Sequence, residues 1–300
     1  MSWIQVRLDT TSDHAKILED LLLKAGACTV TLQDASNQPI YEPELGTTPL
    51  WNSTSVVGLF DANIRTDDVI PFLKKNAGLN PFPKHKVELL EEKDWEREWM
   101  THFHPMQFGN RLWVCPSWEE VPVPEAVNLM LDPGLAFGTG THPTTALCLQ
   151  WLDQQASLEG KTIIDYGCGS GILAIAALLL GAKSAIGVDL DPQALEATIE
   201  NAKRNHIPTD KLEVFLPGGE PSDQADVVVA NILAGPLTQL APELASLTKE
   251  GGSIALSGIL TEQANKIIQT YGQWFSMNTA VTFDGWTMLY GKRSHKQAHK

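Results

Sequence analysis

Residues 162–190 read TIIDYGCGSGILAIAALLLGAKSAIGVDL, and this segment carries the clearest pattern of secondary structure in the chain. Two short apolar runs, 162–167 and 185–190, enclose a glycine-rich turn and a helical run at 171–180. Strands buried on both faces read as continuous apolar runs, and alternation of strand and helix gives parallel strands joined by right-handed crossovers. The stretch therefore predicts one strand–helix–strand unit of a doubly wound, Rossmann-like α/β sheet.

The same alternation extends in both directions from this unit. The predicted strands lie at 111–115, 127–131, 212–216, 225–233, 253–259, 276–283 and 286–291, and the predicted helices at 144–156, 193–205, 236–247 and 261–272. We expect these elements to form one α/β domain over residues 106–293.

The first ninety residues follow a different pattern. Strands are predicted at 3–8, 28–33, 55–60 and 85–90, with helices at 13–25 and 66–77. The order β-α-β-β-α-β is that of a ferredoxin-like α+β sandwich. We expect this small domain at 1–91, a helical linker at 92–105 that carries the sequence EKDWEREWMTHF, and a disordered basic tail at 294–300.

Composition excludes several classes of protein. The 300 residues carry a net charge of −14, which argues against a protein that neutralises phosphates with clustered Lys and Arg, and so against direct nucleic-acid binding. Four cysteines without a C-x-x-C pair suggest neither a disulfide framework nor a zinc site. The longest apolar run, 172–182, is shorter than the ~20 residues that a membrane span needs, and we expect a cytoplasmic protein.

The glycine-rich turn is the strongest local motif. Gly167, Gly169 and Gly171 allow a tight turn in which a ligand lies against bare main chain at a helix N-terminus. Asp189 ends the next predicted strand, close to the separation of about 20 residues expected of an acid that binds a ribose. The pattern indicates an adenosine-containing cofactor at the carboxyl edge of the sheet, although such a glycine motif can also be only a structural turn.

The carboxylate that opens the motif, Asp165, helps to choose between cofactors. A dinucleotide fingerprint reads G-x-G-x-x-G and binds a pyrophosphate, whereas here the spacing is G-x-G-x-G behind an acid. Asp165 would repel a pyrophosphate and attract a cation. S-adenosyl-L-methionine carries an ammonium and a sulfonium and no phosphate, so the charges favour this methyl donor over NAD.

Asn231 stands at the end of a predicted strand, at the edge where open α/β sheets bind ligands. Its amide can accept a hydrogen bond from a target amine and hold the lone pair toward a methyl group, or it can simply cap the strand. Enzymes that methylate flipped bases usually place two prolines and an aromatic residue after this amide. Here Ile232 and Leu233 follow, which disfavours a base as the substrate.

Four motifs together resemble the PrmA family of bacterial ribosomal protein methyltransferases. They are LDPGLAFGTGTHPTT at 131–145, DYGCGSG at 165–171, VDLDP at 188–192 and VVVANILAGPL at 227–237. The similarity extends over essentially the whole chain. It implies a seven-stranded class I methyltransferase domain preceded by a substrate-recognition domain.

The resemblance also implies an activity: trimethylation of the N-terminal α-amine and lysine ε-amines of large-subunit ribosomal protein eleven, with S-adenosyl-L-methionine as methyl donor. Carried over by position, Thr145, Gly167, Asp189 and Asn231 contact the cofactor. With Asp165 and Gly169 they form the expected cofactor-binding set, and Asn231 is also the expected catalytic residue. No metal is expected.

No side chain is nominated as a general base. His142 lies in the right loop, but a structural loop histidine is an equal alternative. We expect a monomer that acts on the free ribosomal protein, since an acidic enzyme attracts a basic protein and is repelled by RNA. Two alternatives stay open: an NAD-dependent oxidoreductase, and a non-catalytic assembly factor that senses the methyl donor.

Overall fold

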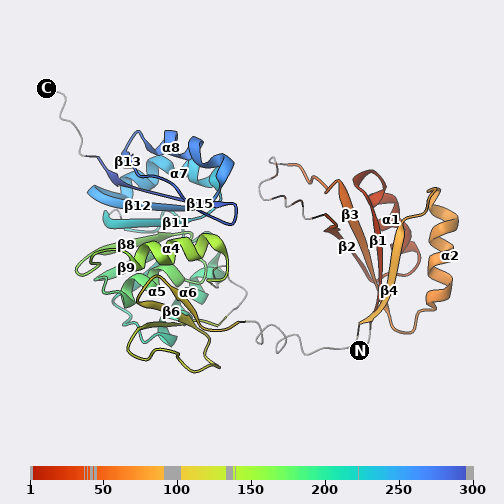
Figure 1. Cartoon of the computed structure of the whole chain (residues 1–300), viewed down its shortest axis with the longest axis horizontal. Helices are drawn as coiled ribbons and strands as arrows, with labels where there is room; N and C mark the ends of the chain where they lie inside the picture. Colours follow the sequence, from red (N-terminus) through yellow and green to blue (C-terminus); the bar gives the residue numbers. More distant parts are fainter. Residues whose placement is uncertain are drawn as a thin grey trace. The chain divides into compact units, whose positions relative to one another are not determined.

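The computed structural model describes residues 3–36, 38, 40, 43, 46–90, 103–132, 138, 140–221 and 223–294. The chain divides into two compact units, residues 1–101 and 102–300, each with its own hydrophobic core (Figure 1). The predicted linker helix lies outside the described residues apart from its last few positions, and so does the predicted tail beyond Ser294.

The first unit is a four-stranded antiparallel sheet with two helices on one face (Figure 1). Its elements are β1 (Trp3–Thr11), α1 (Ser12–Lys24), β2 (Thr29–Asp34), β3 (Ser53–Asp61), α2 (Thr66–Ala77) and β4 (Lys84–Leu90), in the sheet order β2-β3-β1-β4. Alternate residues of β1 point to the helices, so that Val6 and Leu8 are buried with Leu18 and Leu22 of α1.

The second unit is built on a large mixed sheet. Its strands are β8 (Thr162–Tyr166), β9 (Ser184–Val188), β10 (Leu212–Phe215), β11 (Ala225–Asn231), β12 (Thr248–Leu260), β13 (Phe275–Met277), β14 (Val281–Phe283) and β15 (Trp286–Arg293). The order is β10-β9-β8-β11-β12-β15-β13, and β14 also pairs with β15. The first five are parallel, and β15 runs antiparallel to its neighbours.

In its described part this sheet has eight strands, one more than the seven expected. The single strand predicted at 276–283 forms two short strands, β13 and β14, that both pair with β15. Between them, Asn278 donates its backbone N–H to Tyr290 O at 2.8 Å, and regular pairing resumes only at Val281. The polar residues in the middle of this segment interrupt the ladder that its apolar ends form.

Helices cover both faces of the large sheet, as a doubly wound fold requires. One face packs against α4 (Pro143–Asp153), α5 (Ile172–Leu179) and α6 (Pro192–Arg204), and the other against α7 (Ala234–Leu247) and α8 (Ala264–Tyr271), with a short 3₁₀ turn at Thr261–Gln263 (Figure 1). Successive strand residues serve opposite faces: Ile163 belongs to the first core and Ile164 to the second. The crossover from β10 to β11 has no helix in its described residues.

A small sheet, β5-β6-β7, packs beside α4. It consists of β5 (Met106–Phe108), β6 (Leu112–Cys115) and β7 (Val127–Met130), of which β5 was not predicted. The buried carboxylate of Asp153 joins it to α4, because it accepts hydrogen bonds from Asn110 N at 2.6 Å and Arg111 Nε at 3.3 Å. Among the described residues, no helix has the length and apolar character needed to cross a bilayer.

Candidate active site

The glycine turn joins β8 to α5 and leaves no room for side chains. Gly167 and Gly171 have φ of +82° and +77°, a region that favours glycine. A Cβ on Gly167 would collide with a methyl group of Ile232, and one on Gly171 would lie 2.7 Å from Cγ2 of Thr198. The side chains of Ile232 and Thr198 therefore fix the path of the turn, in which Gly167 and Gly169 are partly exposed and Gly171 is buried.

Two buried polar residues of α6 support the same turn. Thr198 Oγ1 donates to Gly169 O at 3.1 Å, and Asn201 Nδ2 donates to Ser170 O at 2.9 Å. Both side chains are buried, on a helix whose other faces are charged and exposed. Sequence reasoning missed them, although polar residues three apart on the apolar face of an amphipathic helix are a usable signal of such a role.

Asp165 is fully buried and only half satisfied. Its Oδ2 accepts a hydrogen bond from Ala174 N at 3.1 Å, while its Oδ1 has no hydrogen-bond partner among the described residues. Burial raises the pKa of this carboxyl from 3.8 to about 7, the Ala174 bond opposes the shift and the charge of Asp189 adds to it. A buried carboxylate oxygen without a partner fits a ligand that carries a positive charge and N–H donors.

Asp189 follows β9 and faces the glycine turn. Its Oδ2 accepts from Gly169 N at 2.9 Å and its Oδ1 from Asp191 N at 3.0 Å. An ionised carboxylate has about four acceptor positions, so each oxygen can accept a further bond from a hydroxyl group. The residue is partly exposed, which leaves it accessible to a ligand at this edge.

Asn231, the last residue of β11, contacts α4. Its Nδ2 donates to Thr145 Oγ1 at 3.2 Å, and Thr145 is fully buried in the first turn of that helix. Within the described residues, the amide oxygen of Asn231 accepts no hydrogen bond. The two residues lie 86 positions apart in the chain, so only the fold brings them together.

His142 caps α4. Its Nδ1 accepts a hydrogen bond from Thr144 N at 3.3 Å, and its ring packs edge-on against Trp286 with 5.0 Å between ring centroids. Burial lowers the pKa of His142, opposed by the nearby charge of Asp284, so the ring is neutral at pH 7. The structure thus gives this histidine a capping role. Most of the preceding loop, 133–137 and 139, lies outside the described residues.

All six residues expected from the sequence lie at the carboxyl edge of the large sheet or at the adjoining end of α4. Two contacts join them: Gly169 with Asp189, and Thr145 with Asn231. Ile232, which sequence reasoning did not single out, fills the space above Gly167.

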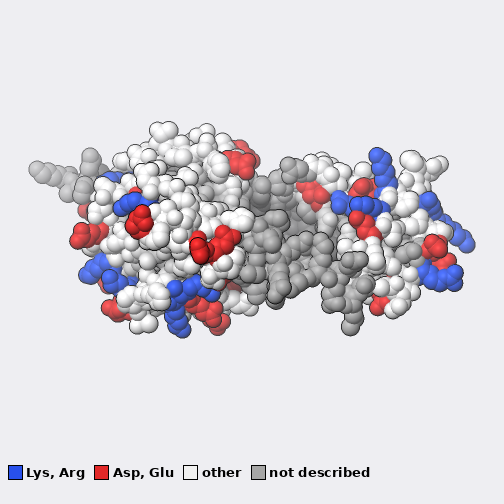
Figure 2. Space-filling view, turned by 60° about the horizontal axis from the view of Figure 1, so that its bottom comes forward, with Lys and Arg blue, Asp and Glu red and all other residues white. Residues whose placement is uncertain are grey.

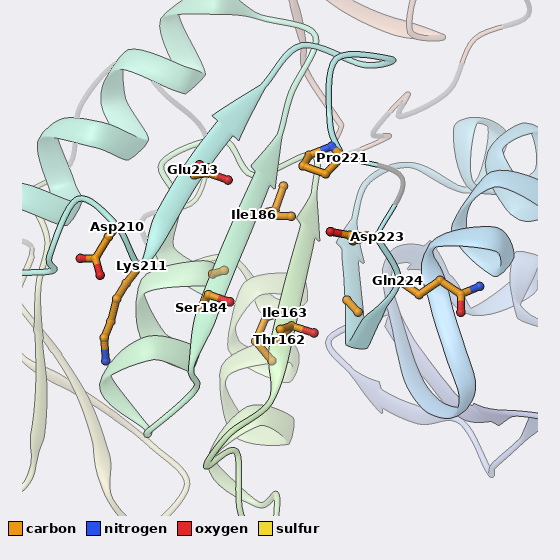
Figure 3. A pocket seen from close by; sticks show the side chains of 12 residues that line it. Thr162, Ile163, Ser184, Ile186, Asp210, Lys211, Glu213, Pro221, Asp223 and Gln224 are labelled. Carbon is orange, nitrogen blue, oxygen red and sulfur yellow. The ribbon is translucent and has the colours of Figure 1, made fainter.

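A cavity of about 200 Å³ lies elsewhere, at the opposite edge (Figure 3). Thr162, Ser184 and Ala225, which begin β8, β9 and β11, contribute to its wall, together with residues of the crossover from β10 to β11. None of the expected site residues lines it. The amino edge of the sheet is therefore open, but it lacks the chemistry of the carboxyl edge.

The chain is similar over nearly its whole length to proteins of one family. Residues 2–294 match the family described as Ribosomal protein L11 methyltransferase (PrmA). A ribosomal protein L11 methyltransferase of Marinomonas sp. (strain MWYL1) is 55% identical over 296 residues, with 98% of this chain and 99% of that protein covered. The corresponding protein of Shewanella baltica (strain OS155) is 56% identical over 294 residues, which are 98% of this chain and 100% of that protein.

A solved structure agrees. The crystal structure of ribosomal protein L11 methylase from Lactobacillus delbrueckii subsp. bulgaricus superposes with a TM-score of 0.57 and 32% identity, and it covers 64% of this chain and 99% of that one. The family model matches nearly all residues, and more than half of the aligned residues are identical in relatives that align over almost their full length. The chain belongs to the ribosomal protein L11 methyltransferase (PrmA) family.

Proposed function

We propose that this chain transfers methyl groups from S-adenosyl-L-methionine to amines of ribosomal protein L11, at the carboxyl edge of the large sheet. The observation that carries the proposal is the Oδ1 of buried Asp165, which has no hydrogen-bond partner among the described residues, beside a turn in which Gly167 and Gly169 are partly exposed. This arrangement fits the cationic amino-acid part of the methyl donor better than a pyrophosphate. Membership of the L11 methyltransferase family supports it independently.

The proposed roles follow the positions of the residues. Gly167 and Gly169 present main chain to the donor, and Asp165 binds its ammonium group. Asp189 accepts from the ribose hydroxyls with the capacity that its two backbone bonds leave. Thr145 fixes the amide of Asn231, which contacts the donor and orients the target amine.

When bound, the donor would supply a methyl group on a positively charged sulfur: the amine nitrogen would bond the methyl carbon in line as the carbon–sulfur bond breaks, and S-adenosylhomocysteine would leave. Alignment then contributes most of the rate, and this is the task of Asn231 and the turn. The amine must be neutral. For a lysine with pKa ~10.4, deprotonation at pH 7 costs about 4.6 kcal/mol, which a neighbouring positive charge reduces. His142 is engaged as a helix cap, so we assign the proton to solvent.

The substrate amines are proposed to be the N-terminal α-amine and lysine ε-amines of the free ribosomal protein, each trimethylated by a monomeric enzyme. We assign substrate recognition to the first unit, as a ferredoxin-like domain at 1–91, and catalysis to 106–293, joined by 92–105. Acidic and basic side chains are interspersed on the visible face of both units (Figure 2), so the net charge of −14 acts as a diffuse attraction for a basic protein.

Mass spectrometry of purified, unmethylated L11 after incubation with this chain and the methyl donor tests the proposal. We expect L11 to gain the mass of one methylene for each methyl group added. Asn231→Ala should lower the transfer rate about 100-fold while calorimetry shows a smaller loss of S-adenosylhomocysteine affinity. Binding of NAD in place of that ligand, or binding of both ligand and L11 without any mass gain, would contradict it.

A further inference from the structure

The turn between β14 and β15 is a tight two-residue hairpin. Phe283 pairs with Trp286, and Asp284 and Gly285 between them have φ of 49° and 78°, as an Asp-Gly hairpin turn requires. Gly285 O accepts hydrogen bonds from Thr261 N at 3.1 Å and Thr261 Oγ1 at 3.0 Å. The tip is therefore held in one position by the residue that follows β12.

This tip lies at the same edge of the sheet as the candidate active site. Because β15 runs antiparallel to β12 and pairs Trp286 with Leu260, its first residue lies where β12 ends. Trp286 packs on His142, the cap of α4, and Thr145 of that helix contacts Asn231. A continuous chain of contacts thus connects the hairpin to the residue proposed to orient the amine.

The hairpin presents apolar side chains to solvent. Val281 and Phe283 occupy alternate positions of β14, and 40% and 55% of their surfaces are exposed. Their cross-strand partners, Met288 and Trp286, are buried. Cross-strand partners lie on the same face of a sheet. Val281 and Phe283 therefore lie on the face that packs on α4, and they continue that face into solvent. We call Val281, Phe283 and Asp284 the hairpin lip.

The lip combines an aromatic ring with a negative charge. Asp284 lies close enough to His142 to oppose the fall in the pKa of that histidine, yet burial keeps the imidazole neutral. The carboxylate therefore faces no positive charge on this ring. An aromatic face beside a carboxylate suits a side chain with an apolar stem and a cationic head.

We propose that the hairpin lip binds the side chain of a target lysine on its way to the active site. The Phe283 ring packs against the four methylenes, and Asp284 attracts the ammonium before it loses its proton nearer to Asn231. Asp284 is not a base for the reaction, because a carboxylate beside an ammonium favours the charged form. The inference rests on the proposed function. It assigns to the lip a preference for lysine ε-amines over the N-terminal α-amine, because the α-amine is not carried on a chain of methylenes.

Steady-state kinetics of the full chain on unmethylated L11 test the lip. Phe283→Ala and Asp284→Asn should each raise KM about 3- to 10-fold and leave kcat within about twofold. Asparagine keeps the turn, because Asn-Gly forms the same hairpin. Phe283→Tyr keeps the aromatic ring, so its KM should stay close to that of the wild type. Peptide mapping should show that methylation of lysines falls more than that of the N-terminus. The matched controls are Ile199→Ala and Asp223→Asn, exposed residues on α6 and at the opposite edge of the sheet.

The outcomes separate the two proposals. If the wild-type chain transfers no methyl group to L11, the proposed function fails. If the wild type is active and both lip variants match it in KM and in the ratio of lysine to α-amine methylation, the lip inference fails and the function stands. A parallel fall in kcat and in S-adenosylhomocysteine affinity would make the hairpin a structural support and also overturn the inference.

Discussion

Two aspartates at opposite edges of the large sheet differ in burial and in the direction of their pKa shifts. Asp165, near the carboxyl end of β8, is buried with one oxygen unpartnered, and its pKa is raised. Asp226, near the amino end of β11, accepts bonds from Thr162 N, Thr162 Oγ1 and Lys249 Nζ, each at 2.9 Å. Burial raises the pKa of Asp226, but these bonds outweigh it and the net shift is downward.

The two carboxylates differ in how deeply they are buried and in how many hydrogen bonds they accept. Asp226 accepts three hydrogen bonds on its Oδ2 and joins β8, β11 and β12, whereas among the described residues Asp165 accepts one bond on Oδ2 and none on its buried Oδ1. The cavity of about 200 Å³ described above lies at the amino edge of the sheet, the edge of Asp226. The proposed binding role of Asp165 rests on this buried oxygen, for which the described residues provide no hydrogen-bond partner.

The largest effect is expected from Gly167→Ala. Its Cβ would collide with Ile232 and block the main chain of the turn, so we expect at least a 100-fold loss of S-adenosylhomocysteine affinity and of methyl transfer. Gly160→Ala is the matched control, since Gly160 has a similar φ of +73° but no heavy atom within 4 Å of the added methyl group. Both variants carry backbone strain, and only the first should lose binding by calorimetry. Equal losses in the two would make the turn merely structural.

Replacing Asp165 should change ligand affinity but not stability, and replacing Asp226 should change stability but not ligand affinity. Asp165→Asn removes a buried charge, so we expect S-adenosylhomocysteine affinity to fall about 10- to 100-fold without loss of stability. Asp226→Ala removes three hydrogen bonds, so we expect it to cost about 1–3 kcal/mol of unfolding free energy and leave affinity within about twofold. Urea unfolding and calorimetry on both variants provide the comparison. A destabilised Asp165→Asn chain that binds normally would reverse it.

The smallest expected effect is a pH dependence of the unfolding free energy and of ligand affinity that arises from the ionisation of Asp165. Its pKa is higher in the folded chain, so the unfolding free energy falls between about pH 4 and pH 7, by at most about 1.4 kcal/mol per pH unit, and the full penalty is present above pH 7. A cationic ligand favours the ionised form. Affinity for S-adenosylhomocysteine should therefore rise about 10-fold from pH 6 to pH 8 in the wild type. A rise of the same size in Asp165→Asn would assign the titration to another group.

Much of the second unit could be predicted because its signals are local. Continuous apolar runs gave the parallel strands, and the spacing of glycines and acids located the edge where Asp165, Asp189 and Asn231 lie. The family resemblance was confirmed over residues 2–294. Thr145 came from that resemblance alone, since nothing near it in sequence indicates its contact with Asn231.

The remaining features depend on contacts between distant segments. Thr198 and Asn201 support the turn across 29 and 31 positions of sequence, and Ile232 closes over Gly167. The predicted strand at 276–283 is divided because pairing with β15 is interrupted in its middle, and β5 is too short for its three residues to show a period. Such features arise from packing, which local patterns do not record.

The short crossover from β10 to β11 makes this enzyme a convenient scaffold for protein engineering. Between Phe215 and Ala225 the chain crosses two strands of the sheet, and Leu216, Gly218 and Asp223 are exposed. Exposed segments of this kind tolerate inserted sequence. A fluorophore on residue 223 or a small reporter domain spliced there would follow the enzyme in a cell extract while the glycine turn and Asn231 keep their geometry.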